Sequence, residues 1–169
     1  MARVSQAALV AIGPLGREPR ALVFDLNPHR ILRRIEPGPR RRLTERIYLR
    51  VPFDATVALE RPDANPAAAR HGVRPQLAAL QTMQNEDAPL LLVWGERTVA
   101  VRIDALDFRE DLFDTHLNPL RATARIDLRV TNEAPGWMSP WLVKVQRADA
   151  EQTADLAKLA FVPAQVGGR

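Results

Sequence analysis

Three strands in succession, within residues 89–133, constrain this chain more than any other feature. Residues 90–94 (LLLVW) form a short unbroken apolar run, which is typical of a strand covered on both faces. Residues 98–105 then alternate between apolar and polar, and residues 121–131 alternate again, so each predicts a strand with one buried face. The side chains expected to point inward are Val99, Val101, Ile103 and Ala105 in the first, and Ala122, Ala124, Ile126, Leu128 and Val130 in the second. The pattern predicts an antiparallel meander with a charged outer face.

Two further strands and two helices are expected on either side of this meander. Alternation predicts strands over residues 20–26, with Leu22, Phe24 and Leu26 on one face, and over residues 46–54. Pro52 cannot donate a ladder hydrogen bond, so the second is an edge strand or has an unpaired end there.

Between these strands, residues 31–35 predict no more than a short amphipathic turn, because Pro37, Gly38 and Pro39 break anything longer. Residues 55–71 are expected to form a surface loop. A helix is predicted over residues 73–84, with an apolar stripe, and a short one over residues 149–161. The apolar stripe is formed by Val73, Leu77, Leu80 and either Met83 or Gln84.

Composition places the chain among soluble globular proteins. Its 169 residues are enough to bury one hydrophobic core without metals or disulfides, and the absence of cysteine fits a reducing compartment. The longest apolar run, residues 88–94, is far shorter than the ~20 residues that span a bilayer. The N-terminal residues match a signal peptide poorly, so we expect a cytoplasmic protein without membrane insertion.

Charge is distributed unevenly along the chain. The first fifty residues hold 11 Arg against 4 acidic residues, whereas the other 119 hold 13 Lys or Arg against 16 acidic residues. Three consecutive arginines, Arg40, Arg41 and Arg42, follow a Pro-Gly-Pro segment and are expected in an exposed loop. They are either solvated or dock onto an acidic neighbour. Nucleic-acid binding is disfavoured, because few aromatic residues are present for base stacking.

The sequence gives catalysis little support. His29, His71 and His116 lie apart, without a second histidine at metal-binding spacing, and no phosphate-binding glycine loop or nucleophile motif is present. His116 near Asp111 and Asp114 is the best metal or acid-base candidate, but a solvated acidic loop explains it better. We therefore expect no catalytic, metal or cofactor site. The apolar segment with Trp137 and Trp141 either packs on its own domain or docks onto another chain.

The order of motifs resembles the tube-adaptor family of phage-tail-like contractile injection systems. The resemblance covers residues 20–133 and rests on an ordered set rather than one motif. The set comprises Phe24-Asp25-Leu26-Asn27-Pro28, a strand ending in Phe53-Asp54, the helix, Pro89 through Trp94-Gly95, the aromatic segment with Phe108 and Leu112-Phe113, and Pro119-Leu120-Arg121-Ala122 leading to Glu133. Many relatives carry a LysM module after this domain, for which residues 134–169 are too short.

The resemblance implies a mainly-β, antiparallel tail-tube-like β-barrel or sandwich over residues 1–133, with one packed helix, followed by a C-terminal extension over residues 134–169. It further implies a homo-hexameric ring that joins the inner tube protein to the spike, hub and baseplate proteins of a phage-tail-like particle in the cytoplasm. Whether such a ring initiates the tube or adapts it stays open. The interface residues expected are Arg40, Arg41, Arg42, Trp137 and Trp141. The alternative is a small basic module that binds nucleic acid through its Arg-rich N-terminal region.

Overall fold

One bent antiparallel sheet makes up most of the molecule. The structure is a computed structural model that describes residues 6–11, 19–86, 89–131 and 139–160, with the backbone alone for Arg41 and residues 139–143. In these residues seven strands pair in the order β2-β1-β5-β6-β7-β4-β3. Their bounds are β1 (Ala8–Ala11), β2 (Arg20–Val23), β3 (Ile31–Pro37), β4 (Leu43–Asp54), β5 (Leu90–Trp94), β6 (Arg97–Phe113) and β7 (Pro119–Val130). The mainly-β, antiparallel class predicted from the sequence is confirmed.

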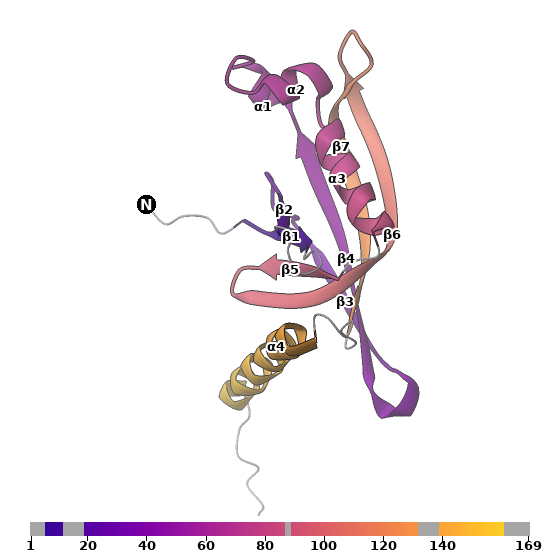
Figure 1. The fold of residues 1–169 in the computed structure, drawn as a ribbon, viewed down its shortest axis with the longest axis vertical. Helices are drawn as coiled ribbons and strands as arrows, with labels where there is room; N and C mark the ends of the chain where they lie inside the picture. The colour runs from indigo at the N-terminus through magenta and orange to yellow at the C-terminus, as the bar shows by residue number, and fades with distance from the viewer. Residues whose placement is uncertain (1–5, 12–18, 87–88, 132–138, 161–169) are drawn as a thin grey trace, which may run out of the picture.

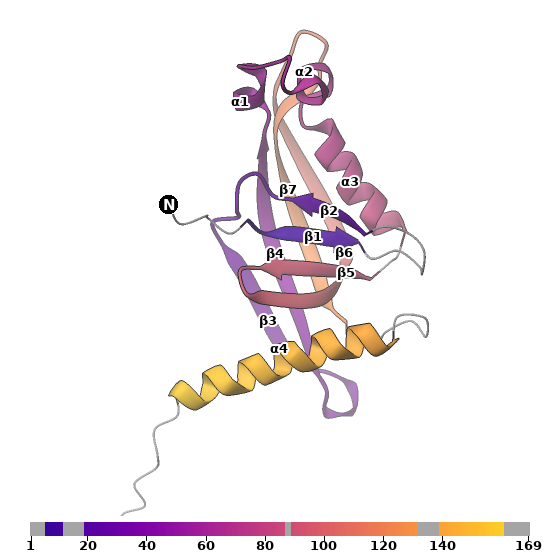
Figure 2. The same cartoon turned by 60° about the vertical axis from the view of Figure 1, so that its left-hand side comes forward.

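The sheet bends so that its two limbs face each other. The transverse limb runs across the molecule and comprises β1, β2, β5 and the start of β6. The longitudinal limb runs along its length and comprises β3, β4, β7 and the rest of β6 (Figures 1 and 2). Residues from both limbs share one core, in a sandwich-like arrangement. The sheet stays open, with β2 at one edge and β3 at the other. The largest fully buried members of this core are Leu9, Phe24, Ile47, Val51, Phe53, Val73, Leu80, Leu90, Leu92, Ile126 and Leu128.

The strands with the clearest sequence patterns are confirmed. In β5, Leu90 and Leu92 belong to the main core, while Leu91 faces the other way into a second apolar cluster with Ala100. This strand is therefore covered on both faces, as its unbroken apolar run predicts. In β7, Ala122, Ala124, Ile126 and Leu128 are buried at every second position.

A β-bulge in β6 makes one part of the sequence interpretation wrong. Alternation predicts an inward Ala105 at the end of a strand, but the pairing with β7 shifts between Ile103 and Ala105, and Ala105 is exposed. Beyond the bulge, Leu106 and Phe108 pack against the core, and β6 continues to Phe113. The inserted residue reverses which face each later side chain occupies.

The N-terminal part departs more from expectation. β1 was not predicted, and β3 replaces the short turn expected over residues 31–35. β2 ends at Val23, so Leu26 is exposed although Phe24 stays in the core. Pro52 lies in the part of β4 that pairs with β7 alone, because β3 pairs only as far as Leu49. The unpaired end predicted for that strand is confirmed.

Three helices join β4 to β5. The helix predicted over residues 73–84 is α3 (Arg74–Asn85). Its apolar stripe is buried and ends at Met83, whereas Gln84 is only partly buried. The loop expected over residues 55–71 is wrong, because it contains α1 (Thr56–Leu59) and α2 (Pro66–His71). Gly72 links α2 to α3 at a φ of 57°, and a Cβ there would lie 2.1 Å from the carbonyl oxygen of Pro119. Only glycine fits this turn and this contact.

The C-terminal helix, α4 (Ser139–Ala160), begins ten residues before the helix predicted over residues 149–161. It crosses the face of the transverse limb opposite the main core, where Val145 packs on Leu91 and Ala100 (Figure 2). Its distal part extends past the sheet, and Leu156 and Leu159 are exposed there.

Candidate assembly surfaces

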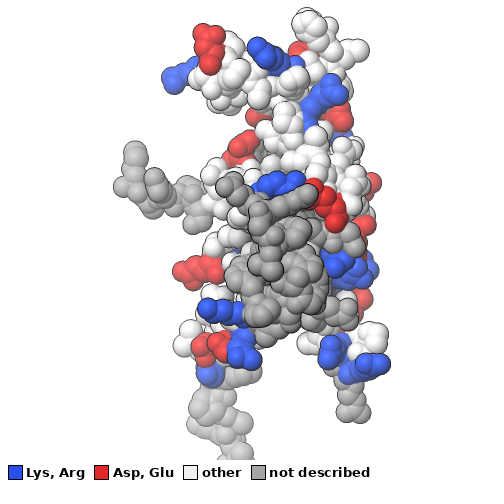
Figure 3. Space-filling view, viewed as in Figure 1, with Lys and Arg blue, Asp and Glu red and all other residues white. Residues whose placement is uncertain are grey.

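The hairpin formed by β3 and β4 carries the predicted Arg40, Arg41 and Arg42. It projects at one end of the molecule, and Lys and Arg side chains gather there in the space-filling view (Figure 3). We call residues 38–43 the basic tip. The Gly38 N–H donates to the Arg42 carbonyl at 2.6 Å, and Arg40 adopts a left-handed conformation with φ of 56°. Arg40 and Arg42 are exposed and form no ion pair with any described residue, while the Arg41 side chain lies outside the description.

β3 itself is an uncovered edge of the sheet. It pairs with β4 on one side only. Its two large apolar side chains beyond Ile31 are about half exposed, Leu32 at 54% and Ile35 at 53%. An edge strand of this length presents unpaired backbone groups that another strand can pair with. Sequence reasoning missed this surface, because it predicted no strand here.

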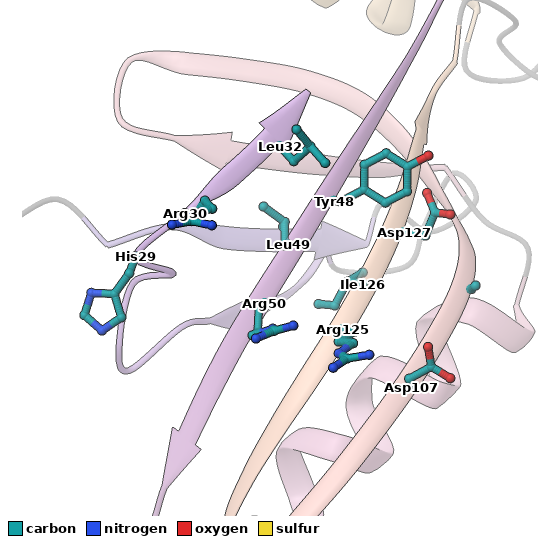
Figure 4. Close-up of a pocket in the computed structure, with 11 residues that line it drawn as sticks. His29, Arg30, Leu32, Tyr48, Leu49, Arg50, Asp107, Arg125, Ile126 and Asp127 are labelled. Carbon is teal, nitrogen blue, oxygen red and sulfur yellow. The ribbon is translucent and has the colours of Figure 1, made fainter. Parts of the chain in front are cut away.

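A groove lies on the outer face of the longitudinal limb, next to this edge. It has a volume of about 640 Å³ and is lined by charged side chains from β4, β6, β7 and the start of β3 (Figure 4). Arg50 and Arg125 lie directly opposite each other on β4 and β7, and Arg30 lies at the end of the same row. None of the three forms an ion pair with a described residue, although Asp107 lies opposite Arg125 on β6 and Asp127 lines the same groove.

The neighbouring cross-strand pair is different, because its charges are compensated within the chain. Arg46 and Arg129 also lie opposite each other. Arg46 Nη1 lies 3.5 Å from Asp104 Oδ2 and 3.6 Å from Asp127 Oδ2, and Arg129 Nη2 lies 3.3 Å from Asp104 Oδ1. Like charges directly opposite on a sheet destabilise it unless acids intervene. In the groove row, Asp107 lies opposite Arg125 but forms no ion pair with a described residue.

The hairpin formed by β6 and β7 ends in an ordered acidic turn, which we call the acidic tip, residues 110–118. Asp114 Oδ1 accepts hydrogen bonds from the backbone N–H groups of His116 and Asn118, both at 2.8 Å. Asn118 Nδ2 donates to Asp114 Oδ2 at 2.9 Å and to the Arg70 carbonyl at 3.2 Å, which ties the tip to α2. The side-chain hydrogen bond from Asn118, with the backbone bonds, holds the pKa of Asp114 below its usual value.

An ion-pair cluster attaches α4 to the sheet. Arg97 Nε donates to Asp149 Oδ1 at 2.9 Å, and Arg97 Nη2 lies 3.4 Å from Glu45 Oε2. The hydrogen bond to Asp149, reinforced by both carboxylates, raises the pKa of Arg97. Gln146 Nε2 adds a hydrogen bond to the Thr131 carbonyl at 2.6 Å. Trp137 and the side chain of Trp141 lie outside the described residues, so their predicted role stays a prediction.

The histidines do not come together in the structure. His29 lines the groove, His71 ends α2 and His116 lies in the acidic tip. Among the described residues, no group of three His, Asp or Glu side chains is placed to hold a metal ion. His116 meets Asp114 through its backbone N–H, in a turn that this contact closes. None of the described helices has the length and apolar character needed to cross a membrane.

Comparison of the chain with models of known protein families and with curated proteins found no match.

Proposed function

We propose that this chain is a structural subunit that joins the inner tube to the baseplate and spike hub of a contractile injection system. It acts through assembly of identical copies into a ring of six, not through catalysis. The resemblance in motif order supports the system and the number of copies. The observation that carries the assembly role is the open sheet, whose edge strand β3 leaves Leu32 and Ile35 uncovered.

An open sheet has two different edges, and this favours a ring. β3 forms the long edge and the four-residue β2 forms the other, with Val23 exposed on it. Contact between two different edges is heterologous, and such contacts close into a ring when the rotation between copies allows it. Pairing of β3 with β2 of the next copy satisfies the backbone groups of both edges and covers their apolar side chains.

The experiment is mass photometry and cryo-electron microscopy of the purified chain and of an edge variant, Leu32→Lys with Ile35→Lys. Lysine on an edge strand opposes pairing with another strand. We expect closed rings for the wild type and no closed rings for the edge variant, whose fold should stay intact. Val57→Lys is the matched control, because Val57 is an exposed apolar residue on α1, away from the edge. A wild type that forms no ring, or an edge variant that forms normal rings, contradicts the proposal.

A second candidate function is nucleic-acid binding, and the groove favours it. Arg30, Arg50 and Arg125 line one groove and form no ion pair with a described residue, so they could contact phosphates there. Retention on DNA that falls steeply with salt, and that Arg50→Gln with Arg125→Gln abolishes, would support this candidate. Retention unchanged by this substitution would remove it.

A further inference from the structure

The basic and acidic tips lie at opposite ends of the molecule. The β3–β4 hairpin projects at one end of the long axis and the β6–β7 hairpin at the other (Figure 1). The basic tip carries three arginines and no acidic residue, whereas the acidic tip carries Glu110, Asp111 and Asp114 and no Lys or Arg. Arg109, at the base of the acidic tip, pairs with Asp111 at 3.1 Å and offsets one of these charges. The two tips therefore have opposite net charge.

Each tip also exposes large apolar side chains. Leu112, Phe113 and Leu117 are exposed on the acidic tip, Leu117 at 78%, and Leu43 is exposed at 64% on the basic tip. Apolar side chains held at the tip of a hairpin contribute nothing to the core of their own chain. Surrounded by charge, they have the composition of a small protein contact with an apolar centre and a polar rim.

Backbone strain is concentrated at the same two places. Among the described residues, three other than glycine have positive φ: Arg40 in the basic tip, and Leu112 and Leu117 in the acidic tip. A left-handed leucine costs free energy that its surroundings must supply, and such residues cluster at functional sites. In the acidic tip this conformation keeps Leu112 and Leu117 in solvent. The bonds of Asp114 and Asn118 hold it in place, so the surface is formed before any partner arrives.

We propose that the acidic tip of one copy of this chain docks onto the basic tip of another. Glu110 and Asp111 face Arg40 and Arg42 across this contact, and the exposed leucines of both tips pack at its centre. Because the tips lie at opposite ends, the contact joins copies head to tail along the long axis. It uses neither the β3 edge nor the β2 edge, so it is independent of the ring proposed above.

The test exchanges charge between the tips of the full-length chain. The first variant, Arg40→Glu with Arg42→Glu, has two acidic tips, and the second, Glu110→Lys with Asp111→Lys, has two basic tips. Asp114 is left intact because it closes its turn. We expect each variant alone to associate at least about tenfold more weakly than the wild type. An equimolar mixture should recover the affinity, because the unaltered acidic tip of the first meets the unaltered basic tip of the second.

Sedimentation velocity over a range of protein and salt concentrations measures this association, with circular dichroism as a check of folding. The matched control is Lys144→Glu with Arg147→Glu on α4, which changes the net charge equally at exposed positions. A concentration-independent wild-type monomer would overturn the proposal, as would wild-type association by either variant alone or a mixture of folded variants that stays dissociated. The same measurements are then repeated with the tip substitutions introduced into the edge variant, which lacks the lateral contact. Association through the tips is thereby measured without ring closure, so either proposal can be contradicted without the other.

Discussion

Strands β5 and β3 have similar lengths and both carry apolar residues, but their surroundings differ completely. β5 has neighbours on both edges, the main core on one face and α4 on the other. β3 has one neighbour, and six of its seven residues are exposed. The sequence of β5 is explained by contacts within the chain. That of β3 is not, which is why the proposed assembly places partners on the β3–β4 hairpin.

Truncation of one leucine in each strand gives the largest expected difference. Leu92→Ala should lower the free energy of unfolding by about 2–5 kcal/mol, because it leaves a cavity in a closed core. Leu32→Ala should change it by less than about 0.5 kcal/mol, because its side chain is half in water. Urea denaturation of the monomer measures both. Equal losses would break the comparison, since they would show that β3 is as important to the monomer as β5.

The packing of α4 on the outer face of β5 can be weakened without changing β5 itself. Arg97→Gln should lower the free energy of unfolding by about 1–2 kcal/mol, because Glu45 and Asp149 lose their shared cation in a partly buried site. Hydrogen exchange should then rise in α4 and in β5 around Leu91. Lys158→Gln is the control, since it breaks an exposed pair with Asp155 on the same helix. Faster exchange in α4 without a change in β5 would show that the helix does not protect that strand.

The smallest expected effect distinguishes the two hairpin tips by pH. Asp114 has a lowered pKa when folded, so its contribution is complete above the ordinary aspartate pKa of about 3.9 and is lost as pH falls through the lower, folded value. Amide exchange and NMR shifts of His116 and Asn118 should report this loss, while Gly38 and Arg42, joined by backbone bonds alone, should not respond. Asp114→Ala should abolish the acid response. A response that persists in this variant would assign it to another group.

Sequence reasoning succeeded where a pattern and its environment agreed. The alternation of β7 and the apolar stripe of α3 identified buried residues, because one face of each meets the core. It failed where a single residue changed the pattern. The bulge beside Asp104 turned Ala105 outward and Leu106 inward, and no spacing rule signals an extra residue before the partner strand is known.

The candidate surfaces were predictable in part. The exposure of Arg40 and Arg42 followed from Pro37, Gly38 and Pro39, whose effect is local. The same residues are the reason that β3 was not predicted. Residues that interrupt regular structure so soon after Ile35 indicate a turn, and the strand is recognised only from its pairing with β4. The acidic tip was visible as a run of acidic and apolar residues, but its place opposite the basic tip depends on the tertiary fold.

The order of strands in the sheet also determines when each part of the chain can fold. Ala8 pairs with Val93, and Phe53 pairs with Ala122, so β1 and β4 each have one neighbouring strand that lies far along the sequence. Pairings so distant in sequence slow folding, because long loops must close before any contact compensates the lost entropy. During synthesis β1 and β4 therefore leave the ribosome well before β5 and β7. Until then β1 can pair only with β2, and β4 only with β3. The β3–β4 hairpin that we propose for assembly is thus one of two hairpins able to form before the rest of the sheet.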